Sequence, residues 1–184
     1  VPDIQKQNIS TYLRMDLRAE ILKENSRENA EYIAAWIGDN LARMQQFMHI
    51  FLHDEHRVVQ LAAHVLGKIG DSYPQQIEDN IDNLVKRMND EGVHVAVKRN
   101  VVRVLQNIQI PERLHGDVMN TCFDLLTDVK ETVAVRVFCM TILDNLSKHY
   151  PEIKQELRTI LQDQLEQGCT AAFRSRASKI LKSK

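Results

Sequence analysis

The residues best suited to chemistry in this sequence are its seven histidines, three of which lie close together. His49, His53 and His56 are spaced by four and three residues, so an uninterrupted helix would bring their imidazoles to one face. Neutral imidazoles at that spacing can bind Zn²⁺ or Ni²⁺. The polar run 53–56 has the pattern of a turn, and its two histidines are three residues apart, unlike those of an HExxH metalloprotease. We therefore expect solvated turn histidines and assign neither a metal site nor a cofactor.

The three cysteines offer little for catalysis. Cys122 and Cys139 fall on apolar helical faces, as small core residues do, and Cys169 follows a glycine in a polar turn. Their odd number and the lack of a CxxC spacing argue against a disulfide framework and against a zinc site. The sequence also contains no GxSxG, GxGxxG or GxxxxGKS/T motif. It therefore favours a non-catalytic protein in the cytoplasm, and we assign no catalytic residue.

Basic side chains form the third candidate set. Lys98, Arg136 and Arg174 recur at equal intervals along the chain, so in a repeat protein they would stack along one edge of a helix layer. One interpretation is a ladder of ion pairs with acidic residues of the intervening turns. The other is a basic track that binds an acidic peptide or a nucleic-acid backbone. The candidate partner-binding residues are Lys98, Arg99, Arg103, Arg136, Arg174 and Arg176.

The elements that would position these residues are repeated helices. Four similar blocks begin at nearly equal intervals, at 57, 96, 134 and 172, and read RVVQLAAHVLGKI, AVKRNVVRVLQNI, AVRVFCMTILDNL and AFRSRASKILKSK. In each block an apolar residue occupies the second position, a small or medium one the sixth and a large aliphatic one the tenth. Steps of four place these positions on one helical face. The blocks therefore predict four amphipathic helices, each the second of a pair.

The first helix of each pair precedes its block, and proline marks the start of three of them. Pro74, Pro111 and Pro151 suit the first turn of a helix, where a missing amide hydrogen breaks no hydrogen bond. We expect one repeat domain over 1–184. Its units are a capping helix pair at 1–40, built from helices at 4–23 and 30–38, and helix-pair repeats at 41–72, 73–109, 110–149 and 150–184.

Short polar turns separate the two helices of each pair. Asp54, Asp90 and Asp128 occupy related places in them, and we expect their carboxylates to accept hydrogen bonds from free amides at the start of the following helix.

These helix pairs resemble a known family. Antiparallel pairs with this repeat length, with Asp in the turn and a Val-Lys or Val-Arg step at the start of the second helix, are similar to HEAT or armadillo-type repeats over nearly the whole chain. The blocks AVKRNVVRVLQ and AVRVFCMTIL also resemble a group of small bacterial HEAT-like proteins of unassigned function. The resemblance implies an all-α, right-handed superhelix of about five helix pairs, with second helices lining a groove for a protein or peptide partner.

Two other functions remain open at this stage. One is a nucleic-acid-binding protein or an enzyme similar to the HEAT-like alkylpurine DNA glycosylases, which combine a basic track with aromatic side chains and a carboxylate. The only tryptophan, Trp36, lies in the capping pair, where it serves either to pack the cap or to stack a base. The other is a self-assembling structural protein. The sequence leaves the oligomeric state and the partner's identity undetermined.

Charge is distributed unevenly although the net charge is only -1, from 24 Lys and Arg against 25 Asp and Glu. Residues 1–56 carry six basic and nine acidic side chains, whereas residues 151–184 carry seven basic and four acidic ones. No stretch approaches the roughly 20 apolar residues that span a bilayer. The small net charge is thus the sum of an acidic first part of the chain and a basic last part.

Overall fold

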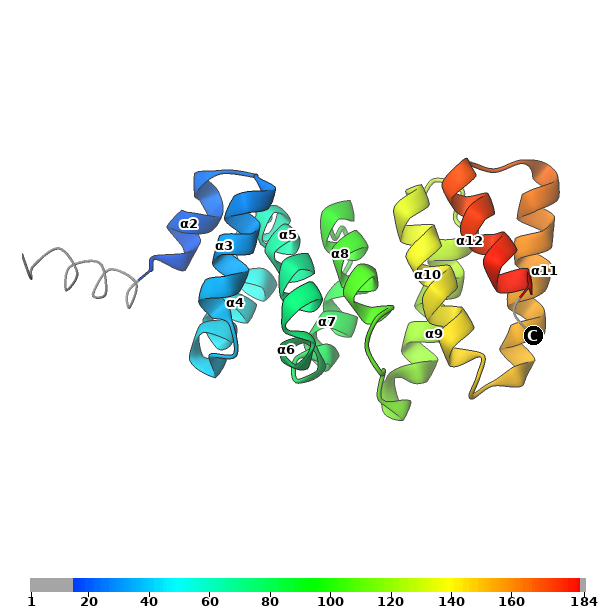
Figure 1. The fold of residues 1–184 in the computed structure, drawn as a ribbon, viewed down its shortest axis with the longest axis horizontal. Helices are drawn as coiled ribbons and strands as arrows, with labels where there is room; N and C mark the ends of the chain where they lie inside the picture. Colours follow the sequence, from blue (N-terminus) through cyan, green and yellow to red (C-terminus); the bar gives the residue numbers. More distant parts are fainter. Residues whose placement is uncertain (1–14, 183–184) are drawn as a thin grey trace, which may run out of the picture.

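The computed structural model describes residues 15–182, and within them every regular element is helical (Figure 1). This confirms the predicted all-α class. The α-helices are α2 (Leu17–Lys23), α3 (Arg27–Ile37), α4 (Leu41–His53), α5 (His56–Ser72), α6 (Pro74–Glu78), α7 (Ile81–Met88), α8 (Val95–Leu105), α9 (His115–Thr127), α10 (Val133–Leu146), α11 (Pro151–Gln167) and α12 (Ala171–Lys182), with a short 3-10 helix, η1 (Glu112–Leu114). Of the helix expected at 4–23, residues 4–14 lie outside the described residues.

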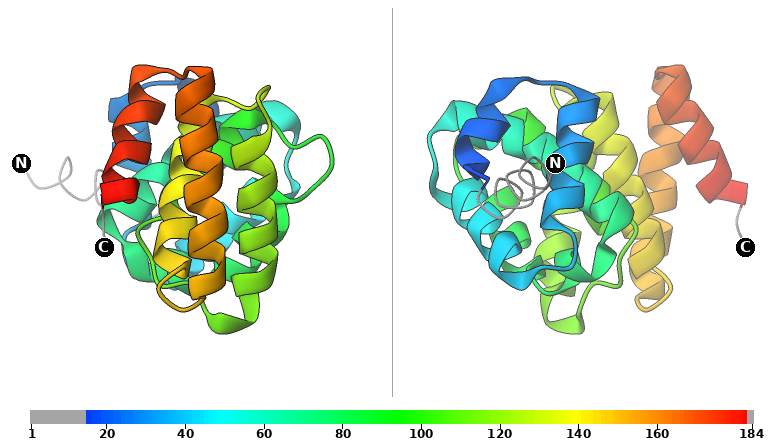
Figure 2. Two further views of the ribbon diagram at one scale, coloured as in Figure 1. Left: turned by 90° about the vertical axis from the view of Figure 1, so that its right-hand side faces the viewer. Right: turned by 60° about the vertical axis from the view of Figure 1, so that its left-hand side comes forward.

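The helices form successive pairs along a solenoid. Each second helix packs on the next, in the order α3, α5, α8, α10 and α12, and these helices form one layer across the front of Figure 1. The first helices α4, α7 and α9 lie behind them, as the two turned views show (Figure 2). In such an arrangement each pair buries its apolar surface against its sequence neighbours.

The apolar face predicted for the second helices is the core of the protein. The second and sixth positions of all four blocks are at most 1% exposed, and the tenth positions are equally buried in the first three blocks. In the last block the tenth position, Leu181, is partly buried. The residues at most 1% exposed are Val58, Ala62, Leu66, Val97, Val101, Leu105, Val135, Cys139, Leu143, Phe173 and Ala177.

Two of the three prolines begin helices as predicted. Pro74 and Pro151 lie in the first turn of α6 and α11. The prediction for Pro111 is wrong: its backbone is extended, with φ -61° and ψ 142°, and it precedes η1, so that α9 begins only at His115. The physical reason is the neighbouring Ile110, whose side chain is buried and holds the connection from α8 against the core.

The turn aspartates act differently from the prediction. Asp54 accepts the amide of Glu55, the residue that caps α5, at 2.7 Å. Asp128 accepts the amide of Lys130 within its turn at 2.8 Å. Asp90 pairs with the Arg87 guanidinium at 2.6 Å, and the start of α8 is capped by an imidazole nitrogen instead. The capping position falls several residues after Asp90 and Asp128, which places their carboxylates out of reach of the free helical amides.

Helices α5 and α8 are in close contact at Gly70. A Cβ atom there would overlap Cγ1 of Val104, so this crossing has no room for a side chain. Gly116, near the start of α9, has open space around the corresponding position.

Replacing Leu143 by Glu should destabilise the fold by about 3–5 kcal/mol, because an unpaired carboxylate would enter a fully buried site. Urea unfolding followed by circular dichroism measures this. The matched control is Val129→Glu, since Val129 is 74% exposed in a turn. Equal unfolding midpoints for the two variants would show that the buried face is assigned incorrectly.

Gly70→Ala should lower the free energy of unfolding by about 1–3 kcal/mol, because α5 and α8 must move apart to admit the methyl group. Gly116→Ala should raise it by about 0.5–1 kcal/mol, since alanine favours the helical backbone and meets no neighbour there. Thermal melts of both variants compare the two effects. A stabilised Gly70→Ala protein would contradict the close crossing.

Candidate functional site

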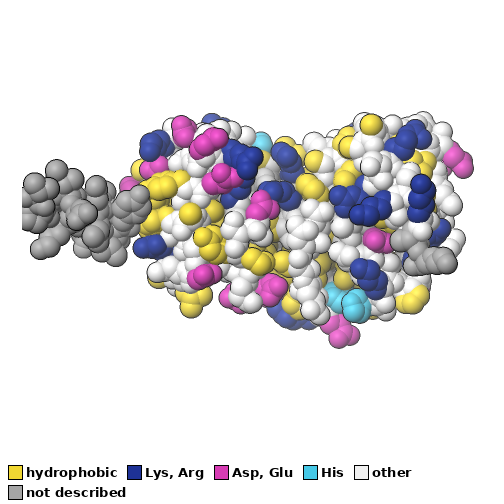
Figure 3. Space-filling view, in the orientation of Figure 1, with side chains coloured by type: hydrophobic (Ala, Val, Ile, Leu, Met, Phe, Trp, Pro, Cys, Tyr) yellow, Lys and Arg dark blue, Asp and Glu magenta, His cyan; other side chains and the backbone are white. Residues whose placement is uncertain are grey.

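We call the outward side of the second helices α5, α8, α10 and α12 the second-helix surface. It contains most of the basic residues predicted from the sequence to bind a partner. Figure 3 shows basic side chains over these helices, mixed with acidic ones on the side nearer α3 and more separate from them toward α12. The pairing of each cation within the fold decides which are available to a partner.

In the part of this surface nearest α3, the basic side chains form ion pairs with acidic side chains of the same protein. Glu31 accepts hydrogen bonds from Lys68 at 2.7 Å and Arg27 at 2.8 Å, and these bonds lower the pKa of Glu31 from 4.5 to about 2. Arg103 pairs with Asp71 at 2.6 Å. These ion pairs connect α3 with α5 and α5 with α8.

The histidine beside this network reports a positive local field. Burial lowers the pKa of His64, and the nearby cations Lys68, Arg103 and Arg99 lower it further. A proton on this imidazole would add a charge where cations already gather.

Two candidate residues instead hold neighbouring repeats together. Lys98 of α8 donates to Glu131, in the turn before α10, at 2.7 Å. Burial raises the pKa of Glu131, but the hydrogen bonds from Lys98 and the Thr132 amide bring it below its ordinary value. Lys98 therefore matches the ion-pair interpretation, and its role as a partner contact stays a prediction.

Arg136 makes a similar connection with neutral partners. It donates to the Leu126 carbonyl at 2.9 Å and to Gln164 at 2.6 Å, and its guanidinium lies 4.8 Å from the ring centre of Phe173. One side chain of α10 thus joins α9, α11 and α12.

The remaining candidates are more accessible. Arg99 and Arg174 are exposed, and the described part of the chain contains no ion pair for either. Arg176 uses one N–H to donate to Thr141 Oγ1 at 2.8 Å. Lys179, one turn further along α12, is also exposed. These side chains can bind an anionic group without breaking an internal ion pair.

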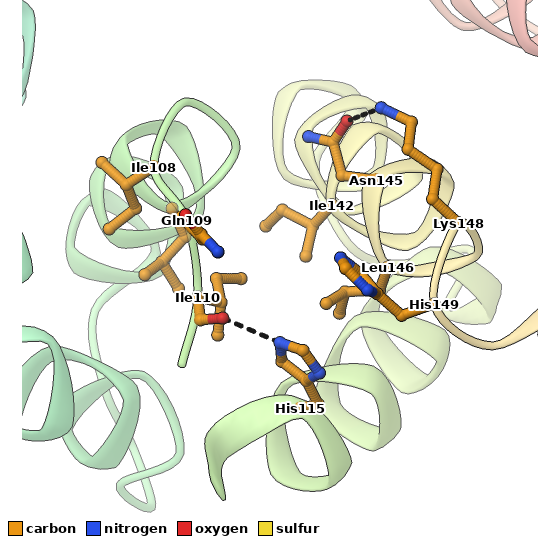
Figure 4. Close-up of a pocket in the computed structure, with 10 residues that line it drawn as sticks. Ile108, Gln109, Ile110, His115, Ile142, Asn145, Leu146, Lys148 and His149 are labelled. Atoms are coloured by element: carbon orange, nitrogen blue, oxygen red, sulfur yellow. Dashed lines mark hydrogen bonds between the residues drawn. The ribbon is translucent and has the colours of Figure 1, made fainter. Parts of the chain in front are cut away.

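A cavity of about 210 Å³ lies between the ends of α8 and α10, which we call the α8/α10 cavity (Figure 4). Leu and Ile make up half of its lining residues and polar residues the other half, and Ile142 points across it toward the connection that follows α8. Lys148 donates to Asn145 at 3.1 Å on one side of it. The lining residues are Leu105, Ile108, Gln109, Ile110, His115, Ile142, Asn145, Leu146, Lys148 and His149.

His115 fixes the shape of this cavity. Its Nε2 lies 2.7 Å from the Ile110 carbonyl oxygen and its Nδ1 lies 3.0 Å from the Tyr150 hydroxyl. A carbonyl can only accept, so Nε2 carries a hydrogen, and in the neutral ring Nδ1 accepts from the hydroxyl. The imidazole therefore joins the connection after α8 to the turn after α10.

A second cavity of about 230 Å³, the α10/α12 cavity, lies on the other side of α10. It shares Asn145 with the first, and Arg176 and Lys179 line it opposite one carboxylate, Asp144. The remaining lining residues are Thr141 and Ile180. Sequence spacing did not identify Lys148, His149 or Asn145 as cavity-lining residues, because the cavities form only where the end of α10 packs beside the connection after α8 and beside α12.

The other chemical candidates take structural positions. The chain turns between His53 and His56 as predicted, and the ring of His56 lies against that of His94. Within residues 15–182 no group of three His, Cys, Asp or Glu side chains is placed to hold a metal ion. Trp36 is buried in the cap beneath Arg43, and Cys122 and Cys139 are buried while Cys169 is partly exposed.

No helix in the described part of the chain is both long and apolar enough to cross a membrane.

Comparison with known proteins gives one family. The HEAT repeat domain family matches residues 17–184. No curated protein matches the sequence significantly. The fold is similar to that of computationally designed armadillo repeat proteins for modular peptide recognition, with 15% sequence identity and a TM-score of 0.58 over 90% of this chain and 80% of that one. An engineered protein gives 20% identity and a TM-score of 0.57 over 89% and 78%.

The Glu31 network should contribute to acid sensitivity. A carboxyl group whose pKa falls on folding stabilises the protein above its ordinary pKa, and that contribution is lost as the pH falls from about 4.5 toward 2. Urea midpoints between these pH values should therefore fall less steeply for Glu31→Gln than for the wild type. Glu28→Gln, which removes an exposed carboxylate of the same helix that has no ion pair in the described chain, is the control. Parallel curves for Glu31→Gln and the wild type would contradict this assignment.

Proposed function

Because the chain belongs to the HEAT repeat family, we propose that it is a non-catalytic interaction module whose second-helix surface binds a protein or peptide partner. The observation that carries the proposal is the combination, on one continuous layer, of exposed cations without internal ion pairs and two cavities that flank α10. The similarity to solenoids designed for peptide recognition supports the same use of the fold.

The geometry divides the predicted partner-binding residues into two groups. Arg99, Arg174 and Arg176 are proposed as direct contacts. Lys98, Arg103 and Arg136 are proposed to act chiefly by holding their repeats in register, because each already has a partner inside the fold.

The units at 1–40, 41–72, 73–109, 110–149 and 150–184 are proposed to act together as one repeat domain. Each second helix supplies one strip of the surface, so a longer partner segment would cross several units. We also propose a cytoplasmic location, since free thiols are typical of a reducing compartment.

Nucleic-acid binding is the less favoured alternative. Duplex binding depends on a broad field of basic side chains, whereas here acids neutralise much of the second-helix surface, through Glu31, Asp71 and Glu131.

Photo-crosslinking in cells that produce this protein tests the proposal. A benzophenone amino acid at Arg99 or Lys179 should give protein adducts, whereas the same group at Lys86 on α7, in the first-helix layer, should give few. The adduct partner is then purified, and Arg99→Glu should weaken its binding by about tenfold, while Lys86→Glu, with the same charge change, should leave it nearly unchanged.

Three outcomes would overturn the proposal. Adducts that disappear after nuclease treatment would favour nucleic-acid binding. Adducts only with a second copy of this chain would favour self-assembly. Equal adduct yields at Lys86 and Arg99 would show that the second-helix surface is not the binding face.

A further inference from the structure

The two cavities beside α10 form a pair with complementary chemistry. Both are lined by Asn145, so they are neighbours along the solenoid, one on each side of the same helix. Five of the ten residues that line the α8/α10 cavity are Leu or Ile, whereas the α10/α12 cavity has one isoleucine among six lining residues. A ligand that crosses α10 would therefore meet a cavity rich in Leu and Ile first and one lined mainly by polar and charged side chains next.

The α8/α10 cavity is large enough for a side chain. An apolar cavity of about 150 Å³ holds a benzene molecule, and the α8/α10 cavity measures about 210 Å³. Burial of a leucine-sized group there would favour a complex, because it removes apolar surface from water. No Phe, Tyr or Trp lines either cavity, so neither offers the aromatic platform on which nucleic-acid bases usually stack.

The second cavity favours a carboxylate. Arg176 and Lys179 face it against the single acid Asp144, and the Arg176 guanidinium has five N–H donors of which the bond to Thr141 uses one. On the rim of the first cavity, Lys148 and His149 are exposed, and no acid lines that cavity. The positive charge of both rims complements an acidic ligand.

The spacing of the cavities sets the spacing of the ligand groups. The axes of packed helices generally lie about 8–10 Å apart, so we expect two cavities on opposite sides of α10 to be separated by about that distance. A polyproline II segment advances about 3.1 Å per residue with three residues per turn, so its residues three apart lie about 9 Å apart on one side. In a β-strand, residues three apart point to opposite sides.

We propose that the surface across α10 binds an acidic polyproline II segment, with an apolar side chain in the α8/α10 cavity and a carboxylate three residues away in the α10/α12 cavity. This inference rests on the proposed function and specifies the class of its partner. Because the segment is already extended in solution, little conformational entropy is lost when it binds.

Fluorescence anisotropy with a designed peptide tests this. The probe is a fluorescein-labelled peptide of about 13 residues in which Leu and Glu alternate at every third position and Pro fills the positions between, so that either chain direction offers the same spacing. It should bind the full chain, and binding should weaken as salt rises. Three altered peptides should lose most of the affinity: one with Lys for Glu, one with Ser for Leu, and one with Leu and Glu two residues apart.

Surface variants locate the site. Lys179→Glu and Lys148→Glu should each weaken binding by about tenfold, because each places a carboxylate at the rim of one cavity. Lys86→Glu on α7 changes the net charge equally on the first-helix layer and should leave the affinity within about twofold. Circular dichroism melts establish that all three variants fold.

The outcomes separate this inference from the proposed function. If the probe does not bind, or if the Ser-for-Leu peptide or the peptide with altered spacing binds as well as the probe, the segment class is wrong. Crosslinking of a protein partner at Arg99 and Lys179 would in that case still support the interaction module. If duplex DNA displaces the probe more effectively than unlabelled peptide does, the surface binds nucleic acid and the inference is overturned.

Discussion

The whole structure depends on burying one apolar stripe from each second helix. Val97, Val101 and Leu105 of α8 illustrate it: all three are at most 1% exposed, although the helix is short and its other side is polar. No helix pair can cover such a stripe alone, because the neighbouring second helices on both sides supply part of the cover. The repeat, the single helix layer and the position of every surface side chain follow from that requirement.

Polar contacts between repeats then divide the basic residues into two groups. Lys98 and Arg136 occupy equivalent positions in their blocks, and both lie at joints where α8 or α10 meets the following repeat. Arg174 holds the equivalent position on α12 and remains exposed. These three equivalent residues thus differ in how available they are to a partner. The reason is that the same repeat position faces a neighbouring repeat in some units and solvent in another.

The connection between α8 and α9 forms one wall of the α8/α10 cavity. The chain stays extended through Pro111, and His115 binds the Ile110 carbonyl and the Tyr150 hydroxyl. The α8/α10 cavity lies between the end of α8 and the end of α10 beside this connection. A helix that began at Pro111 would remove this extended connection. The departure from regular repeat geometry therefore coincides with the proposed binding surface.

The helical class, the period and the buried stripe can all be predicted from the sequence, because the spacing of four between apolar residues is a local property of each helix. The His53–His56 turn and the burial of Cys122 and Cys139 are predictable for the same reason. Which cations are neutralised depends instead on tertiary packing, since the partners of Lys98 and Arg103 come from distant parts of the chain. Packing also places Asn145 between two cavities. A cavity between helices depends on how far apart the helices lie, and the sequence pattern of a single helix does not contain that distance.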